Sequence, residues 1–199
     1  MKHYFHIIIF LFTHDLGNLK KIWEIEFLHK DFSWKEAISQ AWKRPHNFIF
    51  YWRLLNFAYH NGTKKQVRAA EKLSHRLNKN FNIEIPVCLE VGLGFTLHHL
   101  TGIVITSRVE KIGINFSIYQ NTTIGFADYS KEGSITIGDN VSIMGHSFIF
   151  GQNLSIGNNV IVGAMSFVNK DIPDNTIIYT KKTNEIKTIP FTQASQAKL

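Results

Sequence analysis

The sequence has almost none of the residues that cross-link a chain. Of its 199 residues only Cys88 is a cysteine, so no disulfide can form within the chain. A disulfide-rich secreted protein is thereby excluded, and a reducing compartment such as the cytoplasm is the expected location. Hydrophobic residues make up 44% of the chain, which is enough for a sizeable core and excludes wholesale disorder.

A long hydrophobic run is missing from the N-terminal region. The apolar stretch there is Ile7–Phe12, whereas a membrane-spanning helix needs about 20 apolar residues. No small-residue cleavage site accompanies it, which argues against a secretory signal. We expect this stretch to be a buried strand or part of a packed helix. Peripheral attachment to the inner face of a membrane is the alternative.

Acidic residues are scarce, and the formal net charge is +7. Between residues 43 and 79 the one acid is Glu71. No recognisable nucleic-acid-reading motif accompanies the cations, so nucleic acid is not an expected partner. A solvated helix face, or attraction to anionic lipid or a polyanionic substrate, would explain them. The cations are Lys43, Arg44, Arg53, Lys64, Lys65, Arg68, Lys72, Arg76 and Lys79.

Residues 1–82 are predicted to form a mainly helical domain, because apolar residues recur at helical intervals over much of this region. Asp31 or Ser33 is a plausible cap for one helix. Glu36 lies three residues after Ser33, which is the spacing of a capping box. Pro45 is expected to end that helix.

From residue 83 the periodicity changes to six. This period fits neither an α-helix nor a simple amphipathic strand, but it fits a solenoid of short strands with glycine, asparagine and aspartate at its corners. We predict a β-helix of hexapeptide repeats over residues 83–178, followed by a tail at 179–199. Its inward aliphatics are expected at Ile85, Val91, Leu97, Ile103, Val109, Ile112, Ile118, Ile124, Ile137, Ile143, Ile149, Ile156, Val162 and Val168.

Residues 126–134, FADYSKEGS, interrupt the repeat. They are polar and contain a glycine, so we expect a loop extruded from the solenoid, where functional residues tend to lie. The corner residues of the solenoid itself are expected to include Asn115, Asp139, Asn140, Asn158 and Asn159.

The order IEIP…VGLGFTLHHLTGIVI…IGINFSIYQNTTIG…IGDNVSIMGHSFIFG…IGNNVIVGAMSFVNKDIPDNTI resembles the serine acetyltransferase branch of the left-handed β-helix acyltransferases. The resemblance implies an α+β fold, in which a helical region precedes a left-handed parallel β-helix. It also implies acetyl-CoA as co-substrate, no metal, and a homotrimer with acetyl-CoA in the cleft between neighbouring solenoids.

The same resemblance assigns roles to two residues. His99, just before "LTGIV", corresponds to the general base, and Glu84, fifteen residues earlier, to the carboxylate that orients it. The chemistry agrees, because a neutral imidazole suits proton abstraction near pH 7 and a carboxylate on its other nitrogen fixes the tautomer. Strand alternation separates the adjacent histidines: if Leu97 points inward, His98 points outward and His99 enters the corner.

Further positions matched by the resemblance concern the ligands. Gly125, Gly145 and Ala164 would line the pantetheine and thioester path, and Lys170 would meet the CoA phosphates. Serine acetyltransferases carry an Arg-His pair late in the extruded loop, but here residues 131–134 read KEGS.

Lys131 is the remaining candidate to hold an acceptor carboxylate. His98, which replaces a family aspartate, is a candidate to contact the acceptor. We therefore expect the acceptor to be a sugar hydroxyl of a bacterial surface polysaccharide.

Three alternatives stay open at this point. Serine itself can be the acceptor, as in cysteine biosynthesis. The chain can also be a non-catalytic trimeric β-helix scaffold. Finally, His98, His99 and His146 could bind zinc between subunits, as histidines do in trimeric β-helix carbonic anhydrases. Their spacing differs from that family's, so no metal is expected.

Overall fold

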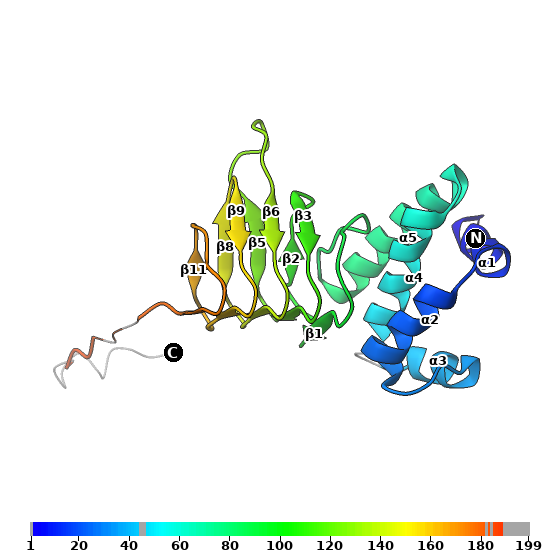
Figure 1. Ribbon diagram of the computed structural model, residues 1–199, viewed down its shortest axis with the longest axis horizontal. Coiled ribbons are helices and arrows are strands. Elements are labelled where there is room, and N and C mark those ends of the chain that lie inside the picture. Colours follow the sequence, from blue (N-terminus) through cyan, green and yellow to red (C-terminus); the bar gives the residue numbers. More distant parts are fainter. Residues whose placement is uncertain (1, 44–46, 182, 184, 189–199) are drawn as a thin grey trace, which may run out of the picture.

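A computed structural model describes residues 2–43, 47–181, 183 and 185–188, and shows helices followed by a parallel β-helix (Figure 1). Arg44 and Pro45, the expected helix breaker, lie outside these residues. Among the residues described, no helix is long and apolar enough to cross a membrane.

The N-terminal part is helical, and it places the Ile7–Phe12 run within a helix rather than a strand, with Ile7 and Phe10 buried. The elements are α1 (Lys2–Thr13), α2 (Gly17–Trp23), the π-helix η1 (Glu24–Leu28), α3 (Trp34–Ala41), α4 (Asn47–Asn61) and α5 (Lys64–Phe81).

The capping box predicted at Ser33 is wrong, although Ser33 does occupy the N-cap position of α3. Its side chain makes no capping hydrogen bond. Glu36 pairs instead with Lys30, at 3.0 Å between Oε1 and Nζ. A capping box forms at the start of α5, where the Thr63 N–H donates to Gln66 Oε1 at 2.7 Å.

Three parallel sheets form the faces of the β-helix. The first sheet contains β1 (Thr96–His98), β4 (Ser117–Tyr119), β7 (Ser142–Ile143), β10 (Ile161–Val162) and β12 (Ile177–Ile178). The second contains β2 (Val104–Ile105), β5 (Thr123–Phe126), β8 (Phe148–Gly151) and β11 (Phe167–Val168). The third contains β3 (Val109–Ile112), β6 (Ile135–Ile137) and β9 (Leu154–Ile156).

The inward columns follow the predicted six-residue register with one correction. In the first sheet Leu97, Ile118 and Ile143 are in register. In the second sheet Ile105, not Ile103, is in register with Ile124. The reason is the corner after β1, which spans residues 99–103, whereas the corner of the next coil spans residues 120–122. Ile103 is nevertheless fully buried.

The predicted asparagine corners are confirmed where the third sheet turns into the first. Asn115, Asn140, Asn159 and Asn175 all have positive φ, which asparagine tolerates better than most residues. Their side-chain amides form a ladder: each Nδ2 donates to the Oδ1 of the next, at 2.8, 3.0 and 2.9 Å. The ladder holds successive coils in one register.

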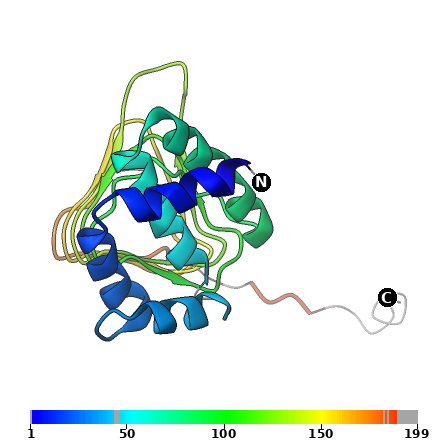
Figure 2. The same cartoon turned by 90° about the vertical axis from the view of Figure 1, so that its right-hand side faces the viewer.

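A loop leaves the β-helix between β5 and β6, and it begins one residue later than the predicted Phe126. Phe126 ends β5 and is buried, so the loop runs over residues 127–134. Viewed from the helical end, it rises from one corner of the solenoid (Figure 2). Gln152 anchors its base by donating to the carbonyls of Asp128 at 3.2 Å and Glu132 at 2.8 Å.

The inward columns make a direct prediction about stability. Replacing fully buried Ile143 by alanine removes packing from two neighbouring coils, so Ile143→Ala should lower the free energy of unfolding by about 2–5 kcal/mol. Urea unfolding measures this. Ser142→Ala, one residue away on the outward face, should change it by less than about 0.5 kcal/mol. Equal effects would contradict the inward register.

Candidate active site

His99 lies at the corner between the first and second sheets, as predicted. β1 ends at His98, and His99 adopts φ +53°, a left-handed conformation that ends the strand. The turn is tight, because the Thr101 N–H donates to the His99 carbonyl at 2.7 Å. The imidazole of His99 is exposed, so a substrate can reach it.

His98 points outward from β1, also as predicted, while Leu97 packs against the core. Its ring stacks on Tyr119 of the next coil, with centroids 4.2 Å apart and planes at 14°. Burial lowers the pKa of His98, and the neighbouring charge of His99 lowers it further. The two adjacent histidines therefore differ: His98 favours its neutral form and is held by stacking, whereas His99 is free to meet solvent.

A cavity of about 370 Å³ lies beside these histidines, between η1 and β1. His29, which follows η1 in a left-handed conformation, shares the cavity with His98 and His99. His29, contributed by the helical domain, was not among the site residues expected from the sequence. The full lining is Glu26, His29, Ile49, Phe95, Thr96, Leu97, His98, His99 and Leu100.

A buried ion pair fixes the wall of this cavity. Arg53 of α4 donates through Nε and Nη2 to the two carboxylate oxygens of Glu26, at 2.7 and 2.6 Å. Both side chains are nearly inaccessible, at 3% and 1% exposure. Arg53 also donates to the carbonyls of Val91 at 3.1 Å and Gly92 at 2.6 Å, and Glu26 accepts the Phe95 N–H at 3.0 Å.

The ion pair thus joins η1 and α4 to the first coil of the β-helix. Arg53 was expected among the surface cations, and this prediction is wrong because Arg53 is buried. The usable signal was its position as a lone cation in the aromatic-rich segment NFIFYWRLLNF, where a charge needs a buried partner.

Glu84 lies on the coil next to β2, as its spacing predicted, but among the described residues no hydrogen bond or ion pair joins its carboxylate to His99. The backbone of Glu84 pairs with the second sheet. Its N–H donates to the Ile103 carbonyl at 2.8 Å, and its carbonyl accepts from the Ile105 N–H at 2.7 Å. Its exposed side chain lines a separate cavity, of about 470 Å³, with His75, Thr106 and Tyr129. Within the described residues no hydrogen bond joins the Glu84 carboxylate to any partner.

The positions predicted for the cofactor spread along the solenoid. Gly145 and Ala164 lie at the same corner of the β-helix as His99, one and two coils beyond β4. Gly125 lies within β5, where an added Cβ would come within 3.1 Å of the Phe150 ring. Lys170 is exposed beyond β11.

Lys131 lies in the extruded loop, at a different corner from His98 and His99. Its Nζ is 3.4 Å from Asp128 Oδ2 of the same loop. The structure of a single chain therefore does not bring Lys131 to the histidine cavity. No lysine or arginine lines that cavity within the part of the chain described here.

Within one chain the three histidines considered as metal ligands do not gather. His146 lies two coils beyond His98, a rise of about 10 Å at the usual strand spacing. In the described ranges, no group of three or more histidine, cysteine, aspartate or glutamate side chains could hold a metal ion.

The chain belongs to the structural class in which a helical domain precedes a parallel β-helix, and it carries a histidine at a corner of that β-helix. No protein-family model matches the chain. The chain has the left-handed β-helix fold of solved serine acetyltransferases, which confirms the predicted fold. An Entamoeba histolytica isoform 3 enzyme in complex with cysteine gives a TM-score of 0.63 at 21% identity, covering 97% of this chain and 62% of that one. A Neisseria gonorrhoeae enzyme in complex with serine gives 0.58 at 26% identity, covering 74% and 58%.

Sequence similarity to curated proteins covers about half the chain. A serine acetyltransferase of Buchnera aphidicola (subsp. Schizaphis graminum) is 34% identical over 111 residues, which is 55% of this chain and 42% of the relative. The putative colanic acid biosynthesis acetyltransferase WcaB of Escherichia coli K12 is 34% identical over 102 residues, 51% of this chain and 62% of the relative. The chain thus spans less than half the length of the first of these relatives.

The buried ion pair predicts a large loss of stability when one partner is removed. Arg53→Met leaves the Glu26 carboxylate buried without its partner and should cost about 3–5 kcal/mol of unfolding free energy in urea. Adding Glu26→Gln to Arg53→Met removes the uncompensated charge and should recover part of that loss. An Arg53→Met protein as stable as the parent would contradict the role of the pair.

The pKa of His98 provides a second prediction. His99→Gln removes the neighbouring charge but leaves the burial, so the pKa of His98 should rise towards its usual value without reaching it. Because the pKa of His98 is lowered in the folded chain, the unfolded chain binds a proton at this imidazole more readily. The free energy of unfolding should therefore decrease as the pH falls below about 6.5. NMR titration of the imidazole protons measures the shift. An unchanged pKa in the variant would show that His99 has no electrostatic effect on His98.

Proposed function

We propose that the protein is an acetyl-CoA-dependent O-acetyltransferase with His99 as its general base. The observation that carries this proposal is an exposed imidazole at the β-helix corner, beside a cavity built jointly by the helical domain and the first coil. The similarity to serine acetyltransferases and to WcaB supports acetyl transfer as the reaction.

In the proposed reaction, neutral His99 accepts the proton of the acceptor hydroxyl while that oxygen attacks the thioester carbonyl of acetyl-CoA. The tetrahedral intermediate then collapses, the carbon–sulfur bond breaks, and the imidazolium returns the proton to the CoA sulfur. The products are an acetyl ester and free CoA. Glu84 is the proposed orienting carboxylate, and it would need to turn from its present exposed position to reach His99.

We propose a sugar hydroxyl as the acceptor. A free amino acid carries a carboxylate, which is best held by a cation, ideally a bidentate arginine. The histidine cavity contributes no lysine or arginine among its lining residues, and Lys131, the cation of the loop, is paired with Asp128. His29 and His98 can hydrogen-bond to sugar hydroxyls, because imidazole nitrogens donate and accept.

Serine is the second candidate acceptor, and the comparisons favour it over a sugar. Serine acetyltransferases predominate among the relatives, in sequence and in solved structure, whereas a polysaccharide connection rests on WcaB. The sugar is placed first for two reasons. The loop lacks the Arg-His pair of serine acetyltransferases and offers Lys131 instead, and His98 replaces the aspartate of that family.

A homotrimer with acetyl-CoA between neighbouring solenoids would complete the proposed site. Gly145 and Ala164 share the His99 corner, and Lys170 is free to meet the CoA phosphates. The adjoining face of the second sheet exposes Phe148 and Phe167, whose rings stack at 5.9 Å and 9°. Such an exposed aromatic column suits a contact with another chain.

The test measures the rate at which CoA is released from acetyl-CoA in the presence of each candidate acceptor: serine, nucleotide sugars and oligosaccharides. His99→Ala should lower the rate by about 10²–10⁴-fold, and Glu84→Gln should lower it less if the carboxylate only orients the base. His60→Gln is the matched control, because it changes an exposed histidine at the end of α4.

Each alternative gives a distinct outcome in this assay. Rapid turnover with serine and none with sugars would replace the sugar proposal by the serine one. Full activity of the His99→Ala protein would overturn the general base. No CoA release with any acceptor would favour the non-catalytic scaffold.

A further inference from the structure

The outer face of α1 is apolar where an exposed helix would normally be polar. Tyr4, Phe5, Ile8 and Phe12 are 54%, 60%, 51% and 86% exposed. At about 100° per residue these four side chains fall within an arc of about 100°, and no polar residue falls between them. The opposite face, around Ile7 and Phe10, is buried in the helical domain. A contiguous exposed apolar face on a surface helix commonly marks a contact with a partner or a membrane.

A cationic stripe runs along the neighbouring helix α5. Lys64–Phe81 contains six lysines and arginines and one acid, Glu71. By the same helical period, all six cations fall within an arc of about 120°, opposite the buried face of Ala70 and Leu73. The six cations are exposed: Lys64, Lys65, Arg68, Lys72, Arg76 and Lys79.

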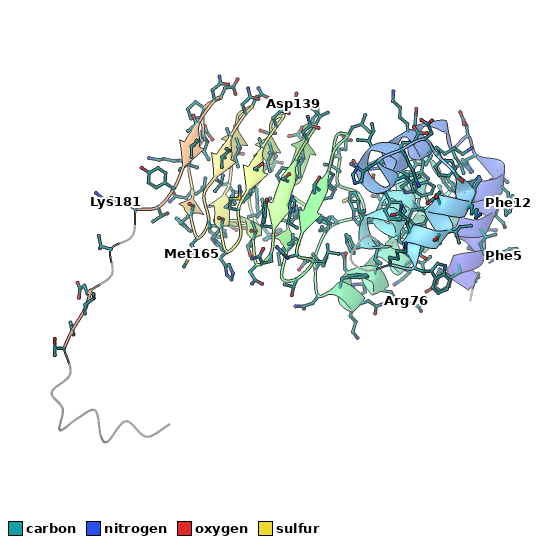
Figure 3. The ribbon with its side chains drawn as sticks, turned by 90° about the horizontal axis from the view of Figure 1, so that it is seen from below. Phe5, Phe12, Arg76, Asp139, Met165 and Lys181 are labelled. Carbon is teal, nitrogen blue, oxygen red and sulfur yellow. The ribbon has the colours of Figure 1, made fainter. Side chains whose placement is uncertain are left out.

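The apolar face and the cationic stripe meet at a groove. A cavity of about 420 Å³ is lined by Tyr4 and Ile8 of α1 and by Arg76 and Asn80 of α5. Phe5 and Phe12 project from α1 at the end of the molecule opposite the C-terminal tail, and Arg76 projects from the side of the helical domain, between that end and the β-helix (Figure 3). The helical end of the protein therefore combines exposed aromatic side chains with positive charge on adjoining faces.

We propose that this end docks on the surface of an anionic lipid bilayer. The aromatic and aliphatic side chains of α1 would enter the headgroup and acyl boundary, as in interfacial helices, while the α5 cations meet lipid phosphates. Self-association through α1 would bring a second cationic stripe towards the first. A soluble polyanion would use the cations and leave Phe5, Ile8 and Phe12 without a role.

Docking in this way would place the catalytic end of the solenoid near the lipid. β1 belongs to the coil next to the helical domain, whereas β12 lies at the far end (Figure 1). An acceptor attached to a lipid would then meet His99 close to the membrane; this consequence rests on the proposed function, but the docking itself does not.

Sedimentation of the full chain with vesicles tests the proposal, without reference to catalysis. The protein should bind vesicles of 30% phosphatidylglycerol in phosphatidylcholine and not phosphatidylcholine alone, and binding should weaken with salt. The variant Phe5→Ser/Ile8→Ser/Phe12→Ser should lose at least about tenfold in binding, and Arg68→Gln/Lys72→Gln a similar amount.

Matched controls change the same chemistry elsewhere. Tyr179→Ser/Ile186→Ser removes exposed apolar groups at the far end, and Lys111→Gln/Lys187→Gln removes two exposed charges; both should bind as the parent does. Circular dichroism confirms folding of each variant.

Three outcomes would overturn the proposal. One is absence of binding to anionic vesicles. Another is vesicle binding that depends on the α5 cations but is unchanged, at unchanged mass, by the α1 substitutions, which would show that the cations alone attract the vesicles, as they would any polyanion. The third is vesicle binding unchanged while the α1 variant loses mass in light scattering, which would assign the surface to a second copy of the chain.

Discussion

The stacking of inward aliphatic side chains from coil to coil is the constraint on which the structure depends. A parallel β-helix has no other core, so each coil must place an aliphatic residue directly over that of its neighbour. Leu97, Ile118 and Ile143 do this in the first sheet. The corners must therefore fall at fixed positions, and each must take the backbone conformation that turns the strand. His99 occupies one such corner with positive φ, so its exposure beside the cavity follows from the packing of the core.

The second requirement is that the helical domain be held rigidly against the first coil. The buried Glu26–Arg53 pair does this through contacts to η1, α4 and the first coil at once. Buried pairs often add little net stability over apolar residues, because desolvating the charges is costly. Here the pair fixes geometry: it sets the separation between His29 on one wall of the cavity and His99 on the other.

The parts of the fold that could be predicted are those governed by a local period. The six-residue spacing identified nearly all inward positions and the asparagine corners, because each depends on residues close in sequence. Ile103 was misplaced because the corner after β1 is longer than its neighbour, which a period cannot reveal. Ser33 failed as a capping-box residue because Glu36 has a better partner in Lys30. The Glu26–Arg53 contact joins residues 27 apart in sequence, with no periodic relation to reveal it.

For the site, the separate orientations of His98 and His99 followed from strand alternation. The contact between Glu84 and His99 could not be judged, because coil spacing places backbones and does not orient carboxylates.

The central claim is that His99 removes the acceptor proton during direct transfer from acetyl-CoA. The pH dependence of kcat/KM for the best acceptor tests it most directly, because it reports the ionisation of the essential base in the free enzyme. We predict a rate that falls on the acid side through one ionisation, and a residual rate in His99→Ala that lacks this ionisation. An acid limb that persists unchanged in His99→Ala would contradict the account.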